Sequence, residues 1–287
     1  MKIMSFESER GNVGDDFNLW VWPRLLPGVF DTDYSKIFIG IGSVLDHRFD
    51  QFGVKHVFGA GARSPETVPQ LDDSWNVHCV RGPLTARALG LPQDVAITDP
   101  GILAAGFFER QLGATDVGLI PYFRSSHDEW KKVARSLNWR FISPREDVET
   151  FFAQLSGCKK VFTESLHGAI FADALRIPWV PYRSFSRVHE GSVSAFKWGD
   201  WLASMDLDVR LNNGPVIWDC PTNTPYSKIK SFAKRVLVVN RFMKELHNAQ
   251  RPQLSCPTVS RKRRLRLLQE LERFSAHGGS GPRSAPC

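Results

Sequence analysis

The chain of 287 residues has little of what marks a secreted, metal-binding or membrane-spanning protein. None of its apolar runs approaches the roughly 18 to 20 residues that a transmembrane helix needs. Its first 17 residues carry charges where a signal peptide would have an apolar stretch. Its five cysteines form no CxxC pair, so neither a zinc site nor a disulfide framework is indicated. We therefore expect a cytoplasmic protein that needs neither a metal nor a cofactor.

Several catalytic signatures are also missing. The sequence contains no Walker loop, no HExxH and no GxSxG, which weakens any assignment to phosphoryl transfer or serine hydrolysis. Its hydrophobic fraction of 42%, which includes 9 Trp and 20 Phe, is typical of a globular protein with a large core. The length suits two domains of ordinary size.

Positive charge is concentrated at the C-terminal end. Residues 226–287 hold 14 Lys and Arg but only 3 Asp and Glu, whereas the first 225 residues hold 23 and 27. A slightly acidic body with a basic tail favours contact with an anionic surface, a membrane leaflet or a polyanion, over a nucleic-acid groove through the fold. We expect the tail to make the protein peripheral at the inner face of the cytoplasmic membrane.

Short apolar strands alternate with helical segments, which is typical of an α/β protein with parallel sheets. Two Rossmann-like halves, joined near residues 105–116, would leave a cleft between them. The predicted boundaries are an N-terminal Rossmann-like domain at 1–105, a C-terminal one at 116–225, a packing helix at 226–250, and a basic helix with a disordered tail at 251–287.

The two C-terminal segments have different patterns. Between residues 226 and 250, apolar residues recur at helical spacing over about six turns, which predicts a helix packed on a domain. The stretch 260–274 combines leucines at 265, 268 and 271 with many basic residues. It is either an amphipathic helix on anionic lipid or a solvated helical tail.

Three stretches contain candidate functional residues. In ERGNVGDDFN (9–18), Gly11 and Gly14 allow tight turns, and Asn12 and Asp15 can cap the following helix. The backbone amides of this stretch either face a ligand anion or belong to a structural loop.

Arg81 in VRGPLT lies at the carboxyl end of a predicted strand, where ligands bind in open α/β sheets. Pro83 suits the first position of the next helix, with Gly82 as its cap. A guanidinium beside a helix N-terminus can receive a phosphate or carboxylate, and the alternative is an interdomain salt bridge.

His167 in FTESLHG lies in the first turn of a helix that directly follows a strand. The positive end of the helix dipole favours a neutral imidazole or a nearby anion. A histidine there either binds an anion or moves a proton near neutral pH, or it is satisfied by neighbouring backbone. Gly168 leaves room for a ligand to approach the backbone.

Seven motifs in order give the chain a family resemblance over roughly residues 10–200. They are GNVGDDFN, GIGSVL, VFGAGAR, VRGPLTARALG, TDPGIL, LIPYF and FTESLHGAIFADALRIPWV. The set resembles the polysaccharide pyruvyl transferase family, and within it the ketal-forming enzymes of bacterial exopolysaccharide synthesis of the succinoglycan and xanthan type.

The resemblance implies a fold and a reaction. The fold would be two Rossmann-like domains facing a cleft, similar to the glycosyltransferase B type, with C-terminal helices. The reaction would transfer pyruvate from phosphoenolpyruvate, the donor substrate, to a sugar of a lipid-linked oligosaccharide, forming a ketal and releasing phosphate. His167 would be the acid–base residue and Arg81 a ligand of phosphoenolpyruvate. The predicted substrate-binding residues are Arg81, Ser165, Leu166, Gly168, Gly11, Asn12, Gly14 and Asp15.

The chain departs from the family pattern at one point. Some members have arginine immediately before the Leu-His pair, where this chain has Ser165. The Ser165 hydroxyl and the helix amides would replace part of that anion clamp, and an arginine elsewhere would supply the charge. The candidates are Arg63, Arg124, Arg183 and Arg187.

Two other functions stay open. A nucleotide-sugar glycosyltransferase would share the architecture, because fold alone does not determine function. A non-catalytic scaffold of polysaccharide assembly would use only the basic tail to join a complex at the membrane. The sequence favours no particular oligomeric state.

Overall fold

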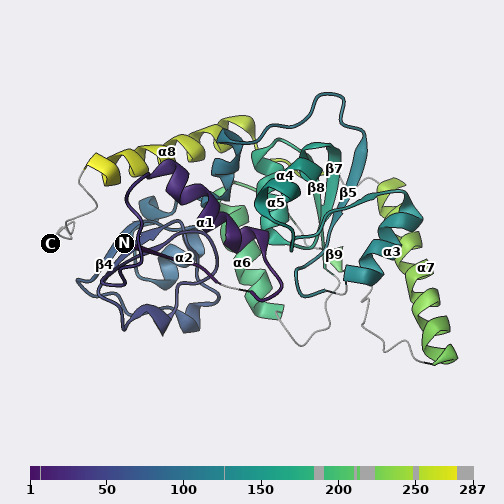
Figure 1. Ribbon diagram of the computed structural model, residues 1–287, viewed down its shortest axis with the longest axis horizontal. Helices are drawn as coiled ribbons and strands as arrows, with labels where there is room; N and C mark the ends of the chain where they lie inside the picture. The colour runs from purple at the N-terminus through teal and green to yellow at the C-terminus, as the bar shows by residue number, and fades with distance from the viewer. Residues whose placement is uncertain are drawn as a thin grey trace.

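The computed structural model describes residues 1–6, 8–125, 127–183, 191–209, 212–213, 224–247 and 252–276 (Figure 1). Within these residues the protein is α/β, with two parallel sheets, as predicted. The first contains β1 (Lys2–Met4), β2 (Lys36–Ile39), β3 (Val54–Phe58) and β4 (Trp75–Cys79) in the order of the sequence. In a Rossmann half the order of the strands reverses at one point of the sheet, and this sheet has no such reversal of strand order.

The second sheet has that reversal. It contains β5 (Asp116–Ile120), β6 (Arg140–Phe141), β7 (Cys158–Thr163), β8 (Trp179–Arg183) and β9 (Asn212–Asn213), in the order β6-β5-β7-β8-β9. The chain moves outward in one direction from β5 to β6 and in the other from β7 to β8. Between β5 and β7 lies therefore a topological switch point, where open α/β sheets bind their ligands at the carboxyl edge.

Helices cover the sheets and join them. The α-helices are α1 (Val13–Leu25), α2 (Pro83–Ala88), α3 (His127–Leu137), α4 (Val148–Ser156), α5 (Leu166–Ala174), α6 (Gly191–Ser204), α7 (Pro225–His247) and α8 (Pro257–Ala276). Four 3₁₀ helices are also described: η1 (His47–Phe49), η2 (Pro65–Thr67), η3 (Gln93–Val95) and η4 (Pro100–Gly106).

Helix α1 packs against both halves of the molecule. Near its start, the Phe17 ring lies 5.2 Å from Phe171 of α5, centroid to centroid, and one turn later Trp22 lies 5.0 Å from Phe38 of the first sheet. Both side chains are fully buried in one continuous core. Large aromatic side chains bury much apolar surface, so this helix joins the two sheets into one packed unit.

Helix α6 lies between β8 and β9 of the second sheet in the sequence but packs on α2 of the first half. Its Asp200 accepts hydrogen bonds from the backbone N–H groups of Leu84, at 2.9 Å, and Thr85, at 3.0 Å. These are orphan donors of the first turn of α2, and a carboxylate there also complements the helix dipole. The segment predicted as part of the second domain thus reaches back to the first.

The basic helix α8 packs on the body of the protein and is therefore not a solvated tail. Leu267, Leu271 and Phe274 are buried, and the Phe274 ring lies 5.9 Å from Phe58 and 5.2 Å from His78. Figure 1 shows α8 (yellow) lying over the half of the molecule that contains α1 and α2. The buried side chains of α8 thus cover aromatic rings that project from β2, β3 and β4 of the first sheet. The predicted disordered end, 277–287, lies outside the described residues.

Helix α7 is packed on one side only. It lies beside α3 at the other end of the molecule, and its Val238 is buried against the second sheet's core (Figure 1). The sequence predicts a helix packed on a domain, and this face of α7 packs in that way. The opposite face carries exposed large apolar side chains. They are Tyr226, Ile229, Phe232, Val236, Leu237 and Met243. In the part of the chain that the structure describes, no helix is long and apolar enough to cross a membrane.

The docking of α8 can be tested by mutation. We expect Phe274→Ala to lower the free energy of unfolding by about 3 to 5 kcal/mol, because it leaves a cavity among aromatic rings. Leu265→Ala on the same helix removes a side chain that is 46% exposed and should change it far less. Chemical denaturation measures both, and equal small effects would contradict the packing of this helix.

Candidate functional site

A cavity of about 320 Å³ lies at the carboxyl ends of strands from both sheets. From the second sheet it is lined by the turn after β5, which includes Arg124, and by the segment 164–167 after β7. Ser43 and Arg63 line it from loops that follow β2 and β3. The cavity thus lies at the β5–β7 switch point, where the topology places a ligand. The start of α1 and the middle of α6 complete its wall.

His167 projects from the first turn of α5, as predicted. Ser165 is the N-cap of this helix, and its Oγ accepts a hydrogen bond from the Gly168 N–H at 3.3 Å. The imidazole stacks on Phe171, and its side chain is 14% exposed. Burial lowers the pKa of His167 to about 3, and the positive charges of Arg81 and Lys197 act in the same direction. The imidazole is therefore neutral at physiological pH.

Gly14 lies against this imidazole. A Cβ atom at position 14 would come within 1.8 Å of His167 Nδ1, closer than any real contact allows. The N-termini of α1 and α5 can meet only because residue 14 has no side chain. Gly14 is thus a neighbour of the proposed catalytic group rather than part of the cavity lining.

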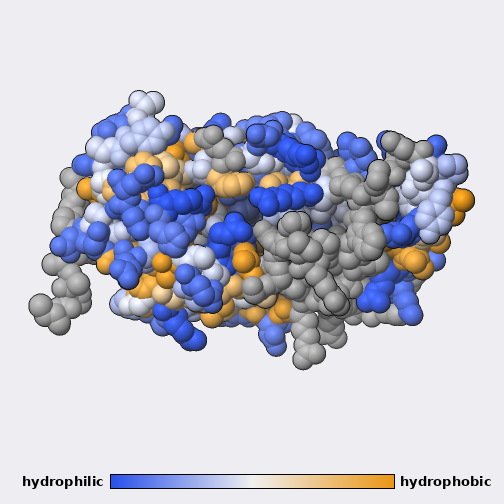
Figure 2. All heavy atoms as spheres, turned by 90° about the horizontal axis from the view of Figure 1, so that it is seen from below, coloured by the Kyte–Doolittle hydropathy of each residue, from blue (hydrophilic) through white to orange (hydrophobic). Residues whose placement is uncertain are grey.

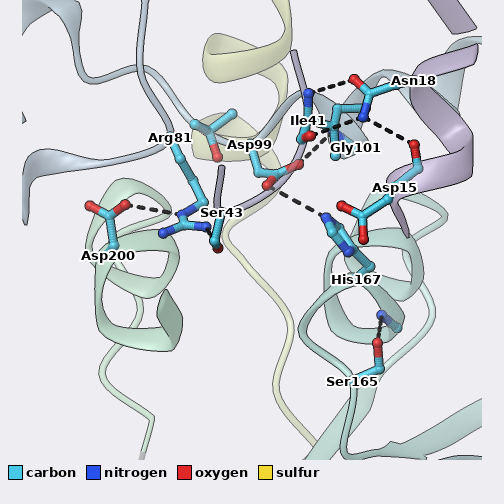
Figure 3. A network of polar contacts seen from close by, with 12 residues as sticks. Asp15, Asn18, Ile41, Ser43, Arg81, Asp99, Gly101, Ser165, His167 and Asp200 are labelled. Atoms are coloured by element: carbon cyan, nitrogen blue, oxygen red, sulfur yellow. Dashed lines mark hydrogen bonds and ion pairs between the residues drawn. The ribbon is translucent and has the colours of Figure 1, made fainter. Parts of the chain in front are cut away.

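Asp99 faces the other nitrogen of the ring, from the N-cap of η4 (Figure 3). Its Oδ2 lies 3.9 Å from His167 Nε2, which is too long for a hydrogen bond, and neither atom has a hydrogen-bond partner. Burial raises the pKa of Asp99 to about 6, against the lowering effect of Arg81. Burying two polar atoms without hydrogen bonds costs free energy, and a catalytic role is one explanation for such atoms in a folded protein.

Asp15 lines the cavity from the first turn of α1. Burial raises its pKa to about 7, although the charge of Lys197 opposes the rise. The sequence predicts Asn12 and Asp15 as helix caps, but Asn12 makes no side-chain cap. Its amide instead donates a hydrogen bond to the Asp15 carboxyl group. Asp15 is therefore a carboxylic acid that can exchange a proton near neutral pH.

Arg81 forms the salt bridge that the sequence leaves as an alternative, and it does not line the cavity. Its side chain is 1% exposed, and its Nε donates to Asp200 Oδ2 at 3.0 Å. The two other guanidinium nitrogens donate to Ser43 Oγ at 2.5 Å and to the Ala62 carbonyl at 3.0 Å. Figure 3 shows Arg81 turned toward Asp200, away from Asp15. Arg81 is thus held inside the fold rather than at the wall of the cavity.

Other cations occupy the cavity wall. Of the four arginines predicted as replacements for the missing clamp, Arg63 and Arg124 line it. The side chain of Arg183, at the end of β8, and the whole of Arg187 lie outside the described residues. Lys197 from α6 also lines the cavity, and no motif in the sequence points to it.

The remaining predicted residues divide into two groups. Ser165 and Leu166 line the cavity, but Gly168 and Gly11 do not. A Cβ at position 168 would lie 2.4 Å from Thr163 Oγ1, so Gly168 allows α5 to pack on β7 rather than a ligand to approach. Gly11 has a φ of +75°, and a Cβ atom at this position would lie 2.8 Å from the Arg145 carbonyl oxygen. Only glycine fits this tight turn. Among the described residues no group of three His, Cys, Asp or Glu side chains is placed to hold a metal ion.

The fold and the cavity together define a class: α/β proteins with a cavity lined by cations at the carboxyl edge of a parallel sheet. Comparisons with known proteins give the family. Residues 12–184 match the model of the polysaccharide pyruvyl transferase family. The chain is also 33% identical over 223 residues to the succinoglycan biosynthesis protein ExoV of Rhizobium meliloti (strain 1021), covering 75% of this chain and 68% of that protein. No solved structure gives a significant match. The chain belongs to the polysaccharide pyruvyl transferase family, as its motifs predict.

The raised pKa of Asp15 predicts a pH-dependent gain in stability for Asp15→Asn. Because the pKa of about 7 in the folded state exceeds the ordinary aspartate pKa of 3.8, the folded state loses stability as pH rises between these values. The asparagine variant avoids this loss. We expect its melting temperature to exceed that of the parent by several degrees at pH 8, and by less at pH 5. Thermal unfolding measures both, and an equal difference at the two pH values would contradict the assignment.

Proposed function

We propose that this chain transfers the pyruvyl group of phosphoenolpyruvate to two hydroxyls of one sugar, forming a cyclic ketal and releasing phosphate. The family and the relative support exopolysaccharide pyruvylation in general. The observation that carries the finer proposal is the cavity, in which Arg63, Arg124 and Lys197 line the same space as His167 and Asp15.

The donor would be bound by these cations. Phosphoenolpyruvate carries its phosphate and its carboxylate on the same carbon, C2, and guanidinium groups bind both anions through paired hydrogen bonds. Neither Arg63 nor Arg124 forms a salt bridge with a described acidic side chain. The Arg124 guanidinium lies over the Phe123 ring, 5.2 Å from its centroid. Lys197 lies near Asp15, whose pKa it lowers. This set takes the place of the arginine that Ser165 replaces.

The reaction needs one acid and one base. Two C–O bonds form at C2 of the donor and its bond to the phosphate oxygen breaks. Both sugar hydroxyls lose their protons: one proton ends on C3, which becomes a methyl group, and the other leaves with the phosphate. A group that is protonated near pH 7 must therefore act beside one that is not.

Asp15 and His167 fit these two roles. With a pKa of about 7, Asp15 holds a proton that it can give to C3. The neutral imidazole of His167 accepts the proton of the attacking hydroxyl, and Asp99 across from Nε2 positions the ring and stabilises the imidazolium that forms. The sequence assigned both roles to His167, and we propose the division because its low pKa leaves no proton to donate.

The acceptor, the location and the wider architecture belong to the same proposal. We propose a sugar of a lipid-linked oligosaccharide as acceptor, and hence a site of action at the cytoplasmic face of the membrane, without a metal or other cofactor. We also propose that the two halves correspond to the domains of the glycosyltransferase B type. The switch-point order of the second sheet and the cavity between the halves support this, and the sequential order of the first sheet departs from it.

The reaction is tested by incubating the protein with a lipid-linked repeat-unit oligosaccharide and either phosphoenolpyruvate or a nucleotide sugar. We expect phosphate release from the first donor and an acceptor mass that increases by one pyruvate less one water. His167→Ala should reduce this rate at least about 100-fold and leave the melting temperature nearly unchanged. Nucleotide release from the second donor would identify a glycosyltransferase instead, and full activity of His167→Ala would remove that residue from the mechanism.

Donor binding is tested separately at Arg63. We expect Arg63→Met to raise the KM for phosphoenolpyruvate by about 10- to 100-fold, because it removes a charged hydrogen-bond donor. Arg87→Met is the matched control, since Arg87 is exposed in the last turn of α2 and does not line the cavity. Steady-state kinetics distinguish the two, and the same KM for both variants would exclude Arg63 as a donor ligand.

A further inference from the structure

Helix α7 presents an apolar face to solvent, which we call the α7 apolar face. Its members are Tyr226, Ile229, Phe232, Val236, Leu237 and Met243, which are between 40% and 74% exposed. At 100° per residue these side chains fall within an arc of about 140° on the helix. An apolar strip of this kind, interrupted by the polar residues Asn240 and Lys244, indicates a binding partner.

The opposite face of α7 is already occupied. Val238 is buried, and Ser231 Oγ donates to Glu129 Oε2 of α3 at 3.2 Å. The helix is therefore held to the body by one face while the other stays outside. Figure 2 shows apolar atoms beside hydrophilic ones at the end of the molecule where Figure 1 places α7.

Cations border the apolar face on both sides. Helix α7 has six Lys and Arg and one acidic residue. By helical geometry, Lys228 and Arg235 lie along one border, and Lys230 and Arg241 along the other. An apolar strip between two cationic rows is the pattern of helices that lie in the headgroup region of an anionic bilayer.

A second feature next to the strip also suits a phospholipid. A cavity of about 360 Å³ lies between α3 and α7 and is lined by Lys132, Arg135, Arg235 and Phe232 among others. Lys132 is paired with Glu129, whereas no described acidic side chain pairs with Arg135 or Arg235. Two guanidinium groups beside an aromatic ring match a phosphate with an attached acyl chain.

We propose that α7 docks this protein on an anionic phospholipid leaflet, with its apolar face inserted at the headgroup level and the α3–α7 cavity holding a lipid phosphate. A lipid leaflet fits this face better than a second copy of the chain, because two cationic faces would repel each other. It also fits better than a polyanion, which would leave the apolar strip in water. Helix α8 contains as many Lys and Arg residues as α7. It does not provide the membrane-binding face, because its Leu267, Leu271 and Phe274 are buried. The proposal stands independently of the proposed reaction.

The test is vesicle flotation of the full chain. We expect binding to vesicles in which about one third of the lipid is phosphatidylglycerol, and little binding to phosphatidylcholine alone. Ile229→Ser with Leu237→Ser should weaken binding at least about tenfold, because two inserted apolar side chains are lost. The matched control is Leu112→Ser with Leu265→Ser, which changes two equally exposed apolar residues outside α7 and should have no effect.

Charge is tested in the same assay. Lys228→Gln with Lys244→Gln should weaken binding at least about tenfold, by the contribution of two cations near an anionic surface. Arg261→Gln with Lys262→Gln removes two exposed charges from α8 and should leave binding nearly unchanged. All these positions are exposed, so circular dichroism should report an unaltered fold.

Three results would overturn the proposal. The first is equal binding to neutral and anionic vesicles, and the second is loss of binding in the α8 variant but not in the α7 variants. The third is a parent protein that sediments as a dimer and becomes a monomer on Ile229→Ser with Leu237→Ser, which would make this face an interface between copies.

Discussion

The double packing of α1 is the constraint on which the site depends. Phe17 fixes this helix to the second half and Trp22 to the first, so its N-terminus has one position relative to both sheets. That position brings Gly14 against the His167 ring and places Asp15 in the cavity wall. A side chain at residue 14 would separate α1 from α5, and the two titrating groups would no longer share one space. The position of Asp15 relative to His167 is therefore set by the aromatic packing of Phe17 and Trp22.

A buried ion pair makes the second connection. Arg81 and Asp200 are almost wholly buried, and such a pair is favourable only when further hydrogen bonds satisfy both groups. Here the carboxylate also accepts from two backbone amides and a hydroxyl of α2, so the desolvation cost is offset. The pair fixes α6 on the first half, and α6 presents Lys197 to the cavity. Arg81 thus acts on the site through position, and its charge also helps to keep His167 neutral.

Local signals in the sequence predicted local structure well. His167 lies in the first turn of the helix that follows β7, as predicted, because such junctions depend on near neighbours, and Ser165 is the N-cap of that helix. Long-range features could not be predicted. The partner of Arg81 lies 119 residues away, and Lys197 enters the cavity only because α6 packs on α2. Likewise, two amphipathic basic helices look alike in sequence, and only tertiary packing buries the stripe of α8 while leaving that of α7 exposed.

The protonation of the site follows from how its charges are buried. The cationic neighbours Arg81 and Lys197 stabilise a neutral imidazole, and burial among carboxyl groups stabilises a protonated Asp15. An anionic donor that enters this cavity offsets the cations, and so raises the pKa of both groups. In the proposed reaction, Asp15 would then keep its proton until C3 takes it, and His167 would become a stronger base when the donor is bound. In the proposed reaction, the charges that bind phosphoenolpyruvate would therefore also hold Asp15 protonated and His167 neutral before the donor arrives.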